Sequence, residues 1–259
     1  ACQYEPGAGL TVTDFDFDGK QEVFVAVESK LYIYESDGNS FESGGGLPLQ
    51  PTSTFYPLQD QAGAANISTL IVQNLDADPD LEIFMGYNLN KGLYCVIGSL
   101  PGSDLSVSDW KLEFADDFYN VEVSPGGGYR VGGVAIDDFD QDGKIEIFTS
   151  HWQDLSATRV YENDGIDSYV IKHTNTPETL ILYPPFDGSF GNSIFYDFDG
   201  DGDSEFLISD IHGHIFLITK SSSNNFEDFG KPAWIYLMNW PTVPDNGFMR
   251  SGALGDLDQ

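Results

Sequence analysis

The sequence predicts an all-β protein, a β-propeller made of four-stranded antiparallel sheets, or blades, of about 60 residues each. Three observations predict it. An acidic segment recurs along the chain at even spacing, a short and strongly apolar segment follows each copy, and helical patterning is weak. The chain contains 28 Gly and 13 Pro, and no long segment repeats apolar residues with the 3.6-residue period of a helix.

The acidic segment first occurs as "TDFDFDGKQEVFV", which begins at Thr13. It returns as "QNLDADPDLEIFMG", "DDFDQDGKIEIFTS" and "YDFDGDGDSEFLIS", and a fifth copy begins at "LGDLDQ". The intervals between successive copies are 60, 64, 59 and 59 residues, measured between Asp14, Asn74, Asp138, Asp197 and Asp256. We therefore expect four complete repeats and the start of a fifth, at approximately residues 8–65, 66–130, 131–190, 191–250 and 251–259.

Each repeat is expected to hold four strands. A short strand leads into the acidic loop ("GLTVTD", "VGGVAID", "NSIFYD"), and an apolar strand leaves it ("EVFVAV", "EIFMGY", "EIFTS", "EFLIS"). The second strand is apolar on consecutive residues, so we expect both of its faces to be buried. The third and fourth strands are predicted as a hairpin in "LYIYESDGNSFE" and "TRVYENDGIDSYV", where Asp-Gly suits a two-residue turn. Residues 44–66 are interpreted as a connection between repeats.

The acidic loops are predicted to bind calcium, which takes roughly six to eight oxygen ligands. Alternate carboxylates converge in a tight turn, and a glycine such as Gly19 permits the sharp bend. In this register, oxygens at loop positions 1, 3, 5 and 9 and a backbone carbonyl at position 7 form each site. The predicted ligands are Asp14, Asp16, Asp18, Lys20 and Glu22; Asn74, Asp76, Asp78, Asp80 and Glu82; Asp138, Asp140, Asp142, Lys144 and Glu146; Asp197, Asp199, Asp201, Asp203 and Glu205; and Asp256 and Asp258 of the fifth copy.

The spacing separates these loops from other acidic sites. An EF-hand needs Glu at position 12 and flanking helices, whereas Val25 and Thr149 occupy that position here and strands flank the loops. Magnesium prefers to keep several waters and fits less well. The second loop has Pro79 in place of the glycine, and proline fixes its own backbone angle. We expect about four calcium ions, with a fifth at the incomplete repeat.

The composition limits the classes of partner. The chain has 42 acidic and 11 basic residues, a formal net charge of −31 and a pI near 4.1. That balance argues against nucleic acid and anionic membranes as partners, and no apolar run reaches the roughly 18 residues that span a bilayer. Of the two cysteines, Cys95 lies in the apolar run "LYCVIG", which favours a buried free thiol over a disulfide with Cys2.

The acidic loops, the "YESDG" and "YENDG" hairpins and partial lead-ins such as Phe190-Gly191 together resemble the FG-GAP/VCBS repeats of integrin α-subunit propellers. The resemblance implies a propeller, commonly of seven blades, with calcium in the loop between the first two strands of a blade. Seven blades would need more residues than this chain has. We therefore expect residues 1–259 to form a single but incomplete propeller domain, either part of a longer protein or a ring closed by other copies.

The functional expectation is a secreted or cell-surface adhesion module that binds a protein or glycan, with structural calcium. Loops with aromatic residues (55–66, 110–129 and 239–249) are candidate contacts, although packing between blades also explains these aromatics. One alternative is a structural subunit of a glycosylated fibre, with Asn66 as the acceptor of the sequon Asn-Ile-Ser. A second alternative is a lyase or hydrolase. We expect no enzyme, because only His212 and His214 hint at a further site.

Overall fold

The described part of the chain is built from strands. The computed structural model describes residues 9–27, 30–39, 46, 50–55, 66–88, 93–98, 105, 110–117, 130–152, 158–174, 194–198, 200–209, 214–218 and 232–237. Every regular element in these ranges is a β-strand, which confirms the all-β prediction. No helix in these ranges is long and apolar enough to cross a membrane.

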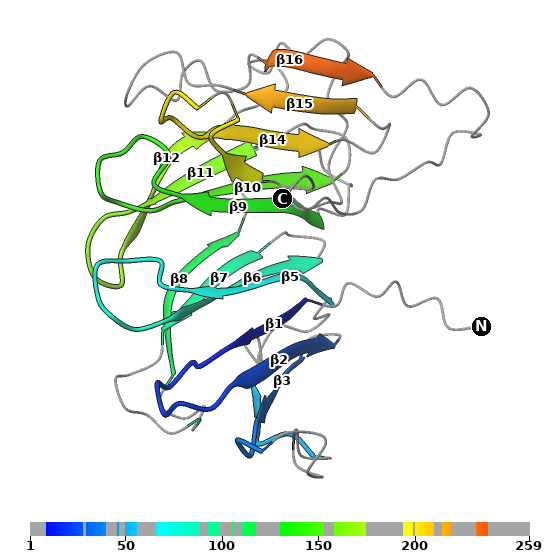
Figure 1. Ribbon diagram of the computed structural model, residues 1–259, viewed down its shortest axis with the longest axis vertical. Helices are drawn as coiled ribbons and strands as arrows, with labels where there is room; N and C mark the ends of the chain where they lie inside the picture. Colours follow the sequence, from blue (N-terminus) through cyan, green and yellow to red (C-terminus); the bar gives the residue numbers. More distant parts are fainter. Residues whose placement is uncertain are drawn as a thin grey trace, which may run out of the picture. The chain divides into compact units, whose positions relative to one another are not determined.

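The strands form four sheets of four strands each, and strands that follow one another in the chain pair as antiparallel neighbours (Figure 1). The four sheets are β1 (Leu10–Thr13), β2 (Glu22–Val27), β3 (Lys30–Glu35) and β4 (Ser53–Phe55); β5 (Asn66–Gln73), β6 (Glu82–Asn88), β7 (Leu93–Gly98) and β8 (Lys111–Asp117); β9 (Arg130–Asp137), β10 (Glu146–Trp152), β11 (Thr158–Asn163) and β12 (Tyr169–Thr174); and β13 (Ile194–Tyr196), β14 (Glu205–Ser209), β15 (His214–Ile218) and β16 (Pro232–Leu237).

Each sheet falls within one expected repeat, apart from β9, which begins one residue early. The four-stranded antiparallel sheet is therefore confirmed as the unit of the fold. Closure into a ring and a total of seven blades stay predictions. The chain divides into two compact units, one of Ala1–Glu122, Gly128–Arg130 and Gly165–Ser168, and one of Val123–Gly127, Val131–Asp164 and Tyr169–Gln259.

The hairpin prediction is correct in the third sheet and wrong in the first. The strands β11 and β12 pair directly, although the turn spans Asp164 to Ser168 and has positive φ at Gly165 and Asp167, so it is longer than two residues. In the first sheet the partner of β3 is β4, which lies in the segment interpreted as a connection. Asp37 still makes a turn there, because its Oδ1 accepts hydrogen bonds from the N–H groups of Asn39 and Gly46.

The strand after each loop does not always have two buried faces. In β6, Ile83, Phe84 and Met85 are all buried, as expected. In β2 the burial alternates, so that Phe24 is buried while Val23 and Val25 are only half-buried. The expectation of two buried faces is therefore wrong for β2, whose second face is only partly covered in the described part of the chain.

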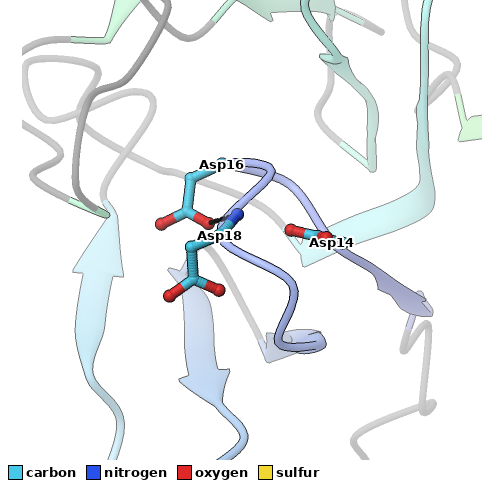
Figure 2. Close-up of side chains that lie close together, drawn as sticks. All are labelled: Asp14, Asp16 and Asp18. Atoms are coloured by element: carbon cyan, nitrogen blue, oxygen red, sulfur yellow. Dashed lines mark hydrogen bonds between the residues drawn. The ribbon is translucent and has the colours of Figure 1, made fainter.

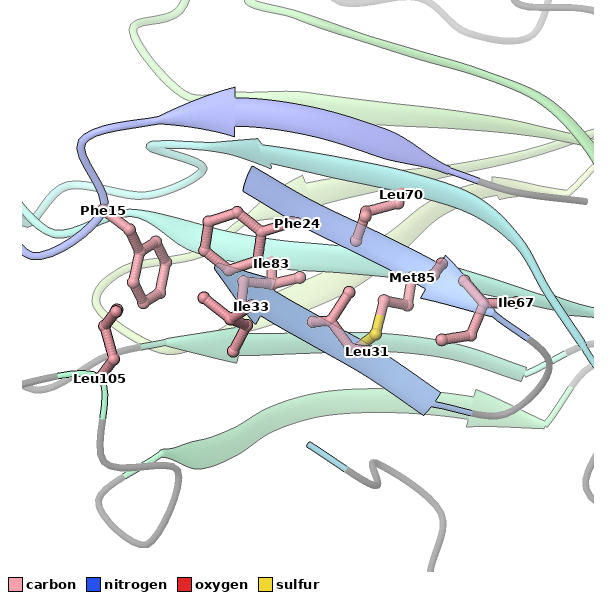
Figure 3. Packing of buried hydrophobic residues seen from close by; sticks show 10 residues of the cluster. Phe15, Phe24, Leu31, Ile33, Ile67, Leu70, Ile83, Met85 and Leu105 are labelled. Carbon is pink, nitrogen blue, oxygen red and sulfur yellow. The ribbon is translucent and has the colours of Figure 1, made fainter. Parts of the chain in front are cut away.

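A hydrophobic core joins the first two sheets of the first unit (Figure 3). It contains Phe24, Leu31 and Ile33 of the first sheet and Ile83 and Met85 of the second. Phe15, the residue after the first loop ligand, packs edge-on against Phe24 at 5.3 Å between ring centroids. The loop is thus fixed to the core by its own second residue.

Trp110 and Phe55, which belong to two of the predicted contact loops, also pack on this core. Their ring centroids lie 5.0 Å apart, and Trp110 lies 5.5 Å from Phe15. These two aromatic side chains therefore serve packing. The rest of the predicted contact loops lies outside the described residues, apart from β8 and Asn66.

The second unit repeats this arrangement with aromatic residues. Phe139 follows the first ligand of the third loop and packs on Phe148 of β10 at 5.2 Å. Phe148 in turn contacts Phe195 of β13 at 4.6 Å and Phe206 of β14 at 5.4 Å. The same loop-to-core anchor therefore occurs in both units.

Candidate metal centres

The first acidic loop connects β1 and β2, and hydrogen bonds from its backbone N–H groups to its own carboxylates hold its turn. Asp14 Oδ2 accepts a hydrogen bond from the N–H of Gly19 at 3.1 Å, and Asp16 Oδ1 accepts one from the N–H of Asp18 at 3.2 Å. Gly19 has φ +89°, which a glycine adopts readily. Carboxylate oxygens of Asp14, Asp16 and Asp18 lie within 4.8 Å of one another (Figure 2).

Glu22 closes this loop from the start of β2. Its side chain is fully buried, and its Oε2 accepts a hydrogen bond from the N–H of Phe15 at 2.6 Å. Its second oxygen, Oε1, has no hydrogen-bond partner, and neither has the buried Oδ1 of Asp14. Two buried carboxylate oxygens in one loop thus lack a donor, which is costly unless a cation meets them.

The third loop has the same geometry with the same atoms. Asp138 Oδ2 accepts from the N–H of Gly143 at 3.0 Å, and Glu146 Oε2 accepts from the N–H of Phe139 at 2.7 Å. The oxygens without partners are again Oδ1 of position 1 and Oε1 of position 9, here on Asp138 and Glu146. Oxygens of Asp138, Asp140 and Glu146 also lie within 4.8 Å of one another.

The fourth loop is wound more tightly. Asp197 accepts hydrogen bonds from the N–H groups of Gly200 at 2.6 Å, Asp201 at 3.1 Å and Gly202 at 2.9 Å. Glu205 Oε2 accepts from the N–H of Phe198 at 2.7 Å, as in the other loops. The predicted ligand Asp199 and the fifth copy, Asp256 and Asp258, lie outside the described residues.

The second loop differs because of its proline. Pro79 has no N–H, so the bond that Gly19 and Gly143 donate to position 1 cannot form. Asn74 instead donates its side-chain amide to the carbonyl of Asp78, while Asp76 Oδ1 accepts from the N–H of Asp78 at 2.8 Å.

Sequence analysis missed Asp167, whose N–H donates to Asp76 Oδ2 at 2.7 Å. Carboxylate oxygens of Asp167, Asp76 and Asp78 lie within 4.8 Å of one another. Asp167 is far from the loop in sequence, so no local pattern predicts that it approaches the loop.

The residues at position 7 divide the loops into two kinds. Lys20 contacts Asp18 Oδ2 at 2.7 Å and also contacts Glu35, and Lys144 contacts Glu162 Oε1 at 3.0 Å. Asp80 and Asp203 replace lysine in the other two loops. The predicted carbonyl ligands of Lys20, Asp80, Lys144 and Asp203 stay predictions. Sequence analysis did not identify Glu35 and Glu162, which lie opposite the loop glutamates across the sheet.

Burial sets the charge state of the glutamates at position 9. It raises the pKa of Glu22 to about 7 and the pKa of Glu82 and Glu146 to about 8. One backbone hydrogen bond lowers the pKa of Glu22 and Glu82 in part, two lower that of Glu146, and neighbouring carboxylates raise all three further. Without a cation these three glutamates therefore hold their protons to a higher pH than an ordinary glutamate, whereas a dication would keep the carboxylates ionised.

These donor sets fit a hard dication. All side-chain donors are carboxylate or amide oxygens, which calcium prefers, and the loop backbone is already folded around the space between them.

Asn66, the predicted glycosylation site, is the first residue of β5 and pairs with Asn88. Its modification and the free thiol of Cys95 stay predictions, and Cys2 and His212 lie outside the described residues.

Residues 138–208 match the FG-GAP-like repeat family, and this stretch spans the third loop and the fourth loop. The chain thus carries an FG-GAP-like repeat, which confirms the resemblance seen in the sequence. The match agrees with the all-β fold of antiparallel sheets, and it names no metal ion.

The chain is 24% identical over 160 residues to cartilage acidic protein 1 of Xenopus tropicalis, a match that covers 59% of this chain and 22% of that protein. The match thus spans about a fifth of that relative. Among solved structures, the crystal structure of the Chaetomium thermophilum Nup170 NTD-Nup53 complex aligns with a TM-score of 0.48 and 11% identity. The alignment covers 94% of this chain and 35% of that one.

Proposed function

We propose that this chain is part of an extracellular, calcium-binding β-propeller that acts as an adhesion or recognition module for a protein or glycan. Calcium has a structural role: it neutralises the loop carboxylates and fixes the turn between the first two strands of each blade. The ligands are the residues named above at positions 1, 3, 5, 7 and 9 of each loop.

One observation carries the calcium part of the proposal. Loops 1 and 3 leave the same two buried oxygens without a hydrogen-bond donor, Oδ1 of position 1 and Oε1 of position 9. The same two atoms lack a donor in two loops that belong to different units, so a local error in one loop does not explain the pattern. A cation between these oxygens would offset the cost of burying them.

The adhesion part rests on the FG-GAP-like repeat and on the similarity to a protein named for cartilage. It also rests on the charge: a surface with net charge −31 favours cationic partners and disfavours nucleic acid. The second candidate is a structural subunit of an extracellular glycosylated fibre, which the sequon at Asn66 favours.

Calorimetric titration with calcium tests the ligand register. Asp140→Ala is expected to weaken one site by at least about tenfold, or ~1.4 kcal/mol, because a ligand carboxylate is lost. Asp80→Ala should cost less, because Asp80 is expected to offer only its backbone carbonyl. Equal losses in the two variants would show that the register is wrong, and no heat of binding in the unaltered chain would refute the site.

Binding to an array of glycans and matrix proteins tests the adhesion role. We expect binding to at least one class of ligand in calcium, and weaker binding after Asp140→Ala. Filaments in electron micrographs without ligand binding would favour the fibre subunit. Cleavage of a glycan would favour the lyase or hydrolase, and would contradict the expectation that the chain is not an enzyme.

A further inference from the structure

The third and fourth acidic loops are joined by hydrogen bonds from side chains that are not predicted ligands. Gln141 of the third loop donates from Nε2 to the carbonyl of Gly202 at 2.6 Å and to Oδ1 of Asp203 at 3.0 Å. Ser204 of the fourth loop donates from Oγ to Oδ2 of Asp137 at 3.0 Å. All five residues belong to the second compact unit, so these bonds connect two neighbouring loops within one unit.

The two donors of these bonds are chain neighbours of predicted ligands. Gln141 lies between Asp140 and Asp142 of the third loop, and Ser204 directly precedes Glu205 of the fourth loop. A displacement of the ligands in either loop would therefore move a bridging side chain as well. The hydrogen bonds thus link the ligand geometry of one loop to that of the other.

Asp137 extends this link to the first ligand of the third loop. Its Oδ1 accepts a hydrogen bond from the N–H of Asp138 at 3.0 Å, while its Oδ2 accepts from Ser204. Asp137 and Ser204 are half-buried, so water competes less for their bond than for one on the open surface. Behind the loops, the contact of Phe148 with Phe206 holds the two sheets together.

The loops of the first unit have no such side chains at the same positions. Phe17 and Ala77 occupy loop position 4, where the third loop has Gln141, and Leu81 of the second loop occupies position 8, where the fourth loop has Ser204. Phe17 has φ 59° and Gln141 has φ 60°, so the backbone at this position is alike and the side chain differs. The chain therefore contains one pair of loops with the bridging groups and one pair without them.

A bound cation would change how firmly the bridging groups are held. Without an ion, the carboxylates of Asp138, Asp140 and Asp142 repel one another, and a dication among them would draw them together. Gln141 shares its backbone with two of these ligands, so an ion in the third loop would fix its position. Its bonds to Gly202 and Asp203 would then hold the fourth loop in the geometry that binds an ion.

We propose that Gln141 and Ser204 couple the third and fourth loops, so that calcium in one loop raises the calcium affinity of the other. This inference rests on the proposed function, because it requires that both loops bind calcium. Gln141 and Ser204 are positioning residues, which act through the ligands beside them. Coupling between two binding sites is reciprocal, so each loop must change the affinity of the other by the same factor.

Charge acts in the opposite direction, which makes the sign of the coupling informative. An ion in the third loop weakens the negative field that attracts an ion to the fourth loop. Salt screens this effect beyond about 8 Å at physiological ionic strength, whereas the hydrogen bonds are short-range contacts. Charge alone therefore predicts that one ion weakens the binding of the other, and the bridging hydrogen bonds predict that it strengthens it.

Calcium titrations of the whole chain, followed by nuclear magnetic resonance at physiological salt, measure each loop separately. With isotope-labelled glycine, the amide signals of Gly143 and Gly202 report the third and fourth loops, because their N–H groups donate to the first ligand of each loop. The signal of Gly19 reports the first loop in the same way. The quantity compared is the calcium concentration at the midpoint of each signal's shift.

Ligand variants measure the coupling. Asp140→Ala removes a ligand of the third loop and should raise the midpoint of Gly202 at least about threefold. Asp201→Ala, in the fourth loop, should raise the midpoint of Gly143 by the same factor. Asp78→Ala, in the second loop, is the matched control for a lost carboxylate and should not raise the midpoint of Gly19.

Variants of the bridging residues test the cause of the coupling. Gln141→Asn keeps an amide and tolerates the positive φ, but it is one methylene too short to reach Gly202 and Asp203. Alone it should raise the midpoints of both loops, and it should reduce the effect of Asp140→Ala on Gly202. Ser204→Ala should also weaken the coupling, whereas Ser204→Thr keeps the hydroxyl and should preserve it. Phe17→Asn, the same change at the same position of the first loop, should leave the coupling intact.

The results separate this inference from the proposed function. A native Gly19 signal shows that a variant is folded, and if a ligand variant unfolds, the midpoints of Gln141→Asn alone decide. An unchanged or lowered Gly202 midpoint in folded Asp140→Ala, or full coupling in a chain with both Gln141→Asn and Ser204→Ala, would overturn the coupling and leave calcium binding intact. The absence of any calcium-dependent shift in the unaltered chain would refute both.

Discussion

Excess chelator is expected to lower the melting temperature of this protein by at least about 10 °C. An ion that binds only the folded state stabilises it by about 2.7 kcal/mol when its concentration is 100 times its dissociation constant. Two loops in each compact unit would then contribute roughly 5 kcal/mol per unit, and 1 kcal/mol shifts the melting temperature of such a domain by at least about 2 °C.

The measurement is a calorimetric or fluorescence melt with calcium, with chelator, and with chelator followed by excess calcium. The last sample should regain the original melting temperature. Magnesium in place of calcium should restore it only in part, because magnesium keeps its waters. Identical melting curves in calcium and in chelator would refute structural calcium.

In chelator, stability is expected to fall as the pH rises from about 4.5 to about 8. The pKa values of Glu22, Glu82 and Glu146 are raised in the folded chain to about 7 or 8, so the folded state binds more protons than the unfolded state in this range. The stability from these protonated glutamates is fully present below the unfolded pKa, near 4.5, and is lost as the pH passes the folded pKa. Calcium should remove this loss, because the ion replaces the protons.

Urea titrations at pH 5, 6.5 and 8, each with calcium and with chelator, measure the effect. The gap between the two conditions should widen with pH. Glu162 has the opposite effect at lower pH. Burial raises its pKa, but hydrogen bonds from Lys172 and Lys144 outweigh burial and leave the pKa lowered. The stability that ionised Glu162 contributes is therefore lost only as the pH falls below the ordinary glutamate range. A gap that stays constant from pH 5 to 8 would show that the buried glutamates do not face the ion.

The loops themselves were predictable because their signal is local. An Asp at alternate positions can bond to the N–H two residues ahead, and glycine is needed where φ is positive, as at Gly19 and Gly143. The apolar strand after the loop and the four-strand repeat are also encoded within some 60 residues. The short range of these interactions explains why the turns of loops 1, 3 and 4 could be predicted from sequence, while their ligand register stays a prediction.

What sequence could not supply are the contacts made across the sheets. Asp167 approaches Asp76 from a distance of 91 residues, and Glu162 meets Lys144 because β10 and β11 happen to pair in one register. The fourth strand of the first sheet was misplaced for the same reason. Its Ser53 pairs with Ile33 by tertiary packing, and no turn signal marks it.

The sequence by itself determined the repeat, its strand order and the acidic loops, since each depends on neighbours within one turn or one hairpin. Tertiary structure alone decided which apolar faces are covered. The run "EVFVAV" is apolar on both sides, yet only the side with Phe24 is buried, because burial depends on the presence of a second sheet and not on the strand's own residues.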